Sequence, residues 1–208
     1  HNPRKNDGVA EGCQYPLCRR FEREHSFPDH HDHHDGKQHI AEQIRRQQRR
    51  GVAAEHCDML LLLGDIINYG PRNRIPDDIN PAAVAARLNA MSSDIVAVRG
   101  NCDSEVDQML LKFPIMADYA VVVDGRRRIF ITHGHIYNED NMPVCRHDVF
   151  VYGHTHLWKL ERHDGCVVCN TGSVTFPKED REPTFALYDD GVMTIRRLDG
   201  SVVSQLTI

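Results

Sequence analysis

The chain has 208 residues, of which 40% are hydrophobic and 26% are charged, which is the usage of an ordinary globular domain. Its formal net charge of −5 argues against broad electrostatic capture of nucleic acid. No apolar run approaches the length of a membrane span. The 14 histidines stand out, because such a density indicates metal binding, proton transfer or a tag.

Residues 1–56 differ in composition from the rest. They hold eight of the 14 histidines and contain no apolar run of strand length. We predict that residues 1–36 are an atypical, disordered, histidine-rich segment and that residues 37–208 form the folded domain. Residues 38–50 could form a helix, although with a thin apolar face.

The cysteine pattern predicts a cytoplasmic protein. The seven cysteines are odd in number and follow no disulfide framework of small secreted domains. The first 25 residues lack the apolar core of a signal peptide. We therefore expect free thiols and a cytoplasmic location.

From Cys57 onward the pattern becomes regular. Helical spacing and capping residues predict helices over residues 80–91 and 104–113. Apolar runs predict strands within residues 59–65, 94–101, 120–135 (a hairpin), 148–156, 165–174, 184–190 and 191–198. Strands alternate with helices first and then follow one another. This order predicts a layered α/β fold, with two sheets or one mixed sheet covered by helices.

Four of the apolar runs end in polar residues beside a glycine. The endings are Gly64-Asp65, Gly100-Asn101-Cys102-Asp103, Thr132-His133-Gly134-His135 and Gly153-His154-Thr155-His156. In α/β sheets, ligands bind beyond the carboxyl ends of strands. Carboxylate, amide oxygen and imidazole together suit divalent ions such as Mn²⁺, Fe²⁺ or Zn²⁺. A carboxylate that bridges two such ions gives a site for phosphoester hydrolysis.

These motifs carry a resemblance to a known family. The series GDIIN, GNCD, THGH, GHTH and NTGSV resembles the calcineurin-like metallophosphoesterases, and within them the small bacterial YfcE-type phosphodiesterases. The resemblance covers about residues 57–208. It implies a four-layer α-β-β-α sandwich with two divalent metal ions, expected to be Mn²⁺. By motif, Asp65 would bridge the metals, Asn101, His133 and His154 would complete one shell, and His156 would bind the other ion.

The beginning of the chain departs from this family pattern. The family opens with a strand ending in D-x-H-G, whose Asp and His bind the metal that His156 also binds. Asp29–His31 and Asp32–His34 both satisfy D-x-H, but no buried strand precedes them. The alternative is a solvated His/Asp tract or an altered reading frame, so the first βα unit is expected to be atypical.

Two further departures lie near the motifs. Cys102 stands where the wider superfamily often has a histidine near the leaving group, and it is our candidate catalytic residue. A thiol does the general-acid work of histidine less well at neutral pH. Thr171 replaces the proline that is usual in the family's N-P-G-S turn.

Four other features have two interpretations each. Cys166 and Cys169 form a C-x-x-C pair, which we interpret as small strand residues rather than a metal site. His135 is expected to support a ligand rather than bind metal. Trp158 could shield the site or pack in the core, and we favour the core. Arg72 and Arg74 could bind phosphate or face water.

The sequence therefore predicts a metal-dependent phosphodiesterase that acts on a small phosphodiester. We expect neither a membrane nor a stably bound nucleic acid as a partner, whereas a homo-oligomer is compatible with the sequence. The rival hypothesis is a catalytically impaired scaffold, like the small metallophosphoesterase-like subunit of the retromer coat. A third hypothesis is metal storage by the histidine tract.

Overall fold

The computed structural model describes residues 16–20, 57–68, 70 and 80–208, and for residues 16–20 it describes the backbone alone. The candidate ligand pairs Asp29–His31 and Asp32–His34 lie outside the described residues, as do Arg72 and Arg74. Segment 1–36, predicted to be disordered, is described only at Pro16–Arg20, which form strand β1. The rest of that prediction stays untested.

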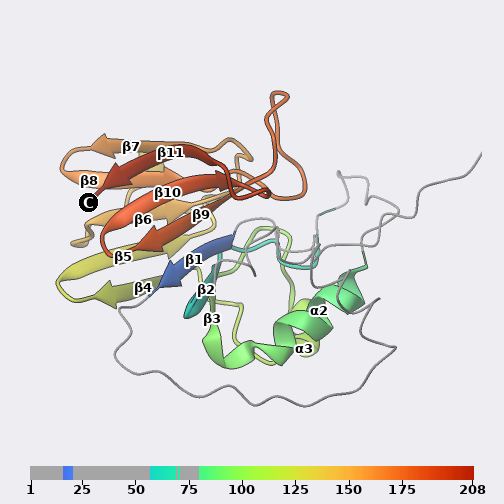
Figure 1. Cartoon of the computed structure of the whole chain (residues 1–208). Helices are drawn as coiled ribbons and strands as arrows, with labels where there is room; N and C mark the ends of the chain where they lie inside the picture. The colour runs from blue at the N-terminus through green and yellow to red at the C-terminus, as the bar shows by residue number, and fades with distance from the viewer. Residues whose placement is uncertain (1–15, 21–56, 69, 71–79) are drawn as a thin grey trace, which may run out of the picture.

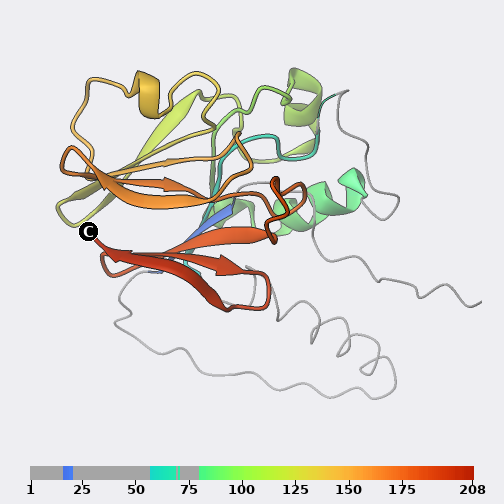
Figure 2. The same ribbon diagram turned by 90° about the horizontal axis from the view of Figure 1, so that it is seen from above.

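Two mixed β-sheets form the body of the molecule. The first has the strand order β11-β10-β9-β1-β2-β3 and the second the order β4-β5-β6-β8-β7. Figure 2 shows β9, β10 and β11 as one layer stacked on the layer of the second sheet. The first sheet consists of β1, β2 (Met59–Leu62), β3 (Ile95–Ala97), β9 (Thr184–Asp189), β10 (Val192–Arg197) and β11 (Val202–Thr207). The second consists of β4 (Tyr119–Asp124), β5 (Arg127–Thr132), β6 (Val149–Tyr152), β7 (Lys159–His163) and β8 (Cys166–Asn170).

The main core lies between the two sheets. Residues of β2 alternate, so Leu61 and Leu63 face this core while Leu62 faces the opposite side, and all three are fully buried. A strand with apolar side chains on both faces must be covered on both. This explains the unbroken LLLL run that the sequence shows before Gly64.

Helices cover the outer face of β2 and β3. Helix α2 (Pro81–Ala90) places Val84 and Leu88 on that face, in one buried cluster with Leu62. It begins where predicted, because the side chain of Asn80 accepts a hydrogen bond from Ala83 N. Helix α3 (Glu105–Leu110) is shorter than predicted, and the turn Ser92–Asp94 separates α2 from β3. Figure 1 shows α2 and α3 on the same side of the molecule.

The outer face of the second sheet is covered differently. Phe130, Phe150 and Tyr152 form a smaller cluster there, against which Tyr137 and Met142 pack. These last two residues belong to the segment that contains the short 3-10 turn Glu139–Asn141. The fold is therefore the expected α/β sandwich of two sheets with helices outside, although this outer layer is a loop in the described part of the chain.

Strand β1 is an inner strand of the first sheet. It lies between β9 and β2, pairing parallel with β9 and antiparallel with β2. A strand joined to its neighbour by a βαβ crossover would instead run parallel to it.

In the described part of the chain, no helix is long and apolar enough to cross a membrane.

Candidate active site

Four strand ends meet at one edge of the sandwich. Strands β2 and β3 are parallel, so Asp65 and Asn101 follow them at the same edge of the first sheet. Strands β5 and β6 are also parallel, which places His133 and His154 at one edge of the second sheet. The ring nitrogen Nδ1 of His133 lies 2.7 Å from the carbonyl oxygen of Leu63 and so joins the two edges.

His133 is the centre of this cluster. Its Nε2 atom lies 3.0 Å from Asn101 Oδ1, 3.1 Å from His154 Nδ1 and 3.5 Å from Asp65 Oδ2. The His133 side chain is fully buried, and Asp65 is 5% exposed. The structure thus brings together four of the five predicted metal ligands around one point.

Lone pairs face each other at this point. A carbonyl oxygen can only accept, so His133 Nδ1 carries the hydrogen that is donated to Leu63, and Nε2 carries a lone pair. Burial lowers the pKa of His133 to about 3, which keeps the ring neutral. The oxygens of Asn101 and Asp65 are acceptors as well. Facing acceptors repel unless a cation or proton lies between them, so the donor set fits a divalent cation.

The spacing agrees with this interpretation. A cation about 2.0–2.2 Å from each nitrogen and oxygen ligand holds neighbouring ligand atoms roughly 3 Å apart. No group of three or more His, Cys, Asp and Glu side chains in the described residues is by itself arranged as a metal site. The amide oxygen of Asn101 is a further candidate ligand, and amide oxygen is an ordinary ligand for hard divalent ions.

Asp103 holds the two turns of the first sheet together. Its carboxylate accepts hydrogen bonds from the backbone N–H groups of Asp65 (2.8 Å), Ile66 (2.9 Å) and Gly100 (2.7 Å). Asp65 Oδ1 in turn accepts from Cys102 N at 2.9 Å. Each turn therefore fixes the other. Sequence reasoning assigned Asp103 no role, although it is the last residue of the GNCD motif.

A glycine makes the close approach of these turns possible. A Cβ atom at Gly100 would lie 2.1 Å from Asp65 Oδ1 and 2.3 Å from Asp65 N. Any side chain there would displace the carboxylate. Gly100 is thus required by the space that Asp65 occupies.

The backbone is also strained at the predicted ligands. Asp65, His154 and His156 have positive φ angles of 49°, 60° and 66°. Non-glycine residues adopt this region only where the surrounding structure imposes it, and such positions cluster at functional sites. The strain therefore supports a functional assignment for all three.

His156 is held by a different segment. Its Nδ1 atom lies 2.5 Å from the carbonyl oxygen of Phe176 and donates to it, so its Nε2 carries the lone pair. Burial lowers the pKa of His156, and the charge of Lys178 lowers it further. Sequence reasoning missed Phe176, because a backbone carbonyl leaves no signal in residue type.

Cys102 and His135 lie beside the cluster. The half-buried thiol of Cys102 accepts a hydrogen bond from Asn101 Nδ2 at 3.2 Å, which turns the amide oxygen toward His133. The ring of His135 lies 5.2 Å from that of His133, and its Nδ1 is buried with no hydrogen-bond partner among the described residues. The proximity to His133 is compatible with the supporting role expected for His135.

The remaining candidates have structural explanations. Cys169 packs between the two sheets, whereas Cys166 packs on the outer face of the second sheet, so the pair shares no metal. Both are free thiols, as are Cys102 and Cys145, but Cys57 is disulfide-bonded, contrary to the expectation of free thiols throughout. Thr171 uses the N–H that a proline would lack, donating to Tyr152 O at 3.2 Å.

Comparison with known proteins agrees with the site. The sequence model of the calcineurin-like phosphoesterase superfamily domain matches residues 27–190. The chain belongs to this superfamily, and it is a phosphoesterase by family. Phosphodiesterase YfcE of Escherichia coli (strain K12) is 45% identical over 158 residues, which cover 75% of this chain and 86% of YfcE.

A solved structure agrees as well. The structure of YfcE, a phosphoesterase from E. coli, superposes with a TM-score of 0.74 at 41% identity, covering 78% of this chain and 91% of YfcE. The probable metallophosphoesterase YsnB of Bacillus subtilis (strain 168) is 27% identical over 115 residues, or 49% of this chain and 62% of YsnB. The family and the fold predicted from the motifs are confirmed.

Proposed function

We propose that the protein is a metal-dependent phosphodiesterase with a dinuclear centre. One observation carries the proposal: oxygen and nitrogen atoms of Asn101, His133, His154 and Asp65 converge from four strand ends on one point. The identity of 45% to phosphodiesterase YfcE supports the class of substrate. Small phosphodiesters are the substrates that we expect.

The donors divide between two ions. Asp65, Asn101, His133 and His154 would hold one divalent ion, and His156 would help to hold a second that shares Asp65. We propose Mn²⁺, the metal that the resemblance to the YfcE-type phosphodiesterases implies; oxygen and imidazole donors together suit Mn²⁺, Fe²⁺ or Zn²⁺. Bound divalent ions supply Lewis acidity toward the phosphate and lower the pKa of a water molecule, so that hydroxide forms near neutral pH.

The protein itself fixes the positions of the candidate ligands and the tautomers of the histidine rings. Asp103 fixes the turns of Asp65 and Asn101 before substrate arrives, so little reorganisation is needed during the reaction. The hydrogen bonds of His133 and His156 to backbone carbonyls set the ring tautomers. Neutral rings with fixed lone pairs are the form in which histidine binds metal.

The test is hydrolysis of bis(p-nitrophenyl) phosphate by purified protein with Mn²⁺. We expect turnover by the wild type and loss of turnover in Asp65→Asn. Equal rates in the two proteins would overturn the proposal. Metal analysis separates the rival hypothesis, because two tightly bound ions per chain support the enzyme whereas one or none supports a binding scaffold. The cytoplasmic location and the oligomeric state stay predictions.

A further inference from the structure

The segment of residues 175–182, called here the 175–182 loop, is attached to His156. Phe176 O accepts from the His156 ring, and Lys178 N donates to His156 O at 3.4 Å. Both contacts involve the same candidate metal ligand. The first residues of the loop therefore lie directly beside the proposed site.

The tip of the loop is a tight turn. Arg181 N donates to Lys178 O at 3.2 Å, and the two residues between them, Glu179 and Asp180, both have φ of 56°. Two successive positive φ angles are those of a type I′ turn, which usually contains Asn or Gly. Here the residues are charged and carry a Cβ, so other contacts must impose the turn.

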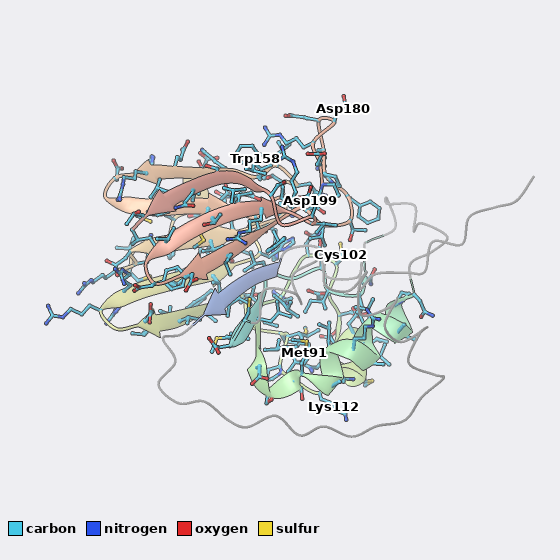
Figure 3. The ribbon with its side chains drawn as sticks, in the orientation of Figure 1. Met91, Cys102, Lys112, Trp158, Asp180 and Asp199 are labelled. Atoms are coloured by element: carbon cyan, nitrogen blue, oxygen red, sulfur yellow. The ribbon has the colours of Figure 1, made fainter. Side chains whose placement is uncertain are left out.

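Arg181 supplies those contacts. Its Nη1 donates to Trp158 O at 2.8 Å, and its guanidinium lies 5.2 Å from the centre of the Trp158 ring. Trp158 packs against the main core, as we predicted. Figure 3 shows Trp158 near the base of the loop and Asp180 at its tip. The turn that carries Lys178 is thus anchored to the body of the protein.

Lys178 differs from the other basic residues nearby. Arg181 pairs with Glu179 at 3.6 Å, and Lys159 pairs with Glu161 at 2.8 Å. The ammonium group of Lys178 is exposed and has no ion-pair partner in the part of the chain that the structure describes. The backbone of Lys178 is bonded to His156, so its unneutralised charge lies on a segment attached to the proposed site, and this charge is opposite to that of a phosphate group.

We propose that Lys178 binds the non-bridging phosphate oxygens of the substrate and that the 175–182 loop positions it for this task. The proposal rests on the proposed phosphodiesterase function and deepens it, because it assigns a substrate-binding residue outside the donor cluster. A lysine ammonium acts on phosphate as a point charge and tolerates several orientations. Lys178 therefore contributes to binding of any small anionic phosphodiester rather than to one leaving group.

The kinetic signature follows from this role. A contact made equally in the bound substrate and in the transition state raises KM when it is lost and leaves kcat unchanged. For Lys178→Ala we expect KM for bis(p-nitrophenyl) phosphate to rise roughly tenfold, the scale of one lost hydrogen bond to a charged group. Lys178→Arg keeps the charge and should stay within about threefold of the wild type.

The experiment uses the full-length protein loaded with Mn²⁺. Lys112→Ala is the matched control, because Lys112 is also an exposed lysine. In the view of Figure 3, Asp180 and Lys112 lie on opposite sides of Cys102. Inorganic phosphate is titrated calorimetrically into the wild type, Lys178→Ala and Lys112→Ala. We expect its Kd to weaken roughly tenfold in Lys178→Ala alone.

Unchanged KM and unchanged phosphate Kd in Lys178→Ala would overturn the proposal for Lys178 while leaving the phosphodiesterase function intact. A fall in kcat at constant KM would also overturn it. If the wild type hydrolyses the substrate no faster than Asp65→Asn does, the proposed function fails instead. The phosphate titration then still decides whether Lys178 binds a phosphate group.

Discussion

His133 Nε2 lies 3.0 Å from Asn101 Oδ1, and each atom presents a lone pair to the other. The hydrogen on His133 Nδ1 is committed to Leu63 O, and the Asn101 amide nitrogen is committed to Cys102 Sγ. The contact is therefore unfavourable in the metal-free protein. A cation converts this repulsion into coordination, so metal binding and stability are linked.

Divalent metal should therefore stabilise the protein. At a Mn²⁺ concentration 100 times the Kd, we expect the free energy of unfolding to rise by about 2.7 kcal/mol and the Tm by at least about 5 °C. Differential scanning calorimetry with Mn²⁺ and with EDTA measures the shift. Asn101→Ala should lose most of it, while His163→Ala, at the exposed end of β7, should keep it. A shift that persists in Asn101→Ala would place the metal elsewhere.

Burial of Asp65 makes the metal-free site a source of instability. Burial raises the pKa of Asp65 to about 6 from an ordinary value of 3.8. The hydrogen bond from Cys102 N lowers this pKa, whereas the nearby charge of Asp103 raises it further. A raised carboxyl pKa means that the folded state binds the proton more tightly than the unfolded state does. The metal-free protein therefore loses stability as pH rises from about 4 to 6, and the full penalty is present above pH 6.

We therefore expect Asp65→Asn to stabilise the metal-free protein. Two pKa units correspond to about 3 kcal/mol, and asparagine still accepts from Cys102 N, so the gain at pH 7.5 should be about 1–3 kcal/mol. At pH 4 the gain should largely vanish, because the wild-type carboxyl is then protonated. Urea unfolding in EDTA at both pH values measures it. Equal stabilities at pH 7.5 would show that Asp65 carries no burial penalty.

The Asp103 carboxylate bridges the turn of Asp65 and the turn of Asn101 through its hydrogen bonds to backbone N–H groups, and this bridge gives a third prediction. Asp103→Asn replaces one acceptor oxygen by an NH₂ group, which then faces at least one backbone N–H donor. The unfolding free energy should fall by about 1–3 kcal/mol, the cost of a buried unsatisfied donor. Mn²⁺ affinity should also fall, because the turns of Asp65 and Asn101 lose their common support.

Urea unfolding and Mn²⁺ titration measure the two effects of Asp103→Asn. The control is Asp164→Asn, at an exposed position with φ of 48° that asparagine accepts readily. If both variants lose the same stability, the bridge is not what holds the turns. If Asp103→Asn lowers stability but leaves Mn²⁺ affinity unchanged, the bridge supports the fold alone.

The ligands on strand ends could be predicted from the sequence because the signal is local. An apolar run, a glycine and a polar residue stand next to one another at Asp65, Asn101, His133 and His154. What the sequence left open was which strands pair across the molecule. The contact between His133 and Leu63 spans 70 residues, and no local pattern encodes it.

Strands β1, β7 and β11 and the turn at Glu179 and Asp180 are among the elements that escaped prediction. Strand β1, of sequence PLCRR, has no alternation of apolar residues, and its place is set by backbone pairing with β9 and β2. The turn at Glu179 and Asp180 lacks the Asn and Gly residues that normally indicate positive φ. Its conformation depends on Arg181 reaching Trp158, a contact across 23 residues.

The role of Cys102 can be separated from that of a nucleophile. Its thiol orients the Asn101 amide, and a serine hydroxyl can accept the same hydrogen bond. Cys102→Ser should therefore keep hydrolysis within about threefold of the wild type. Cys102→Ala frees the amide to rotate, and loss of one such hydrogen bond, about 1 kcal/mol, should weaken Mn²⁺ binding roughly fivefold. Saturating Mn²⁺ should restore most of the activity of Cys102→Ala.

Cys145→Ser, at an exposed free thiol, is the control and should match the wild type. If Cys102 were the nucleophile, alanine would abolish turnover at every Mn²⁺ concentration, and that result would replace the orienting role with a covalent one.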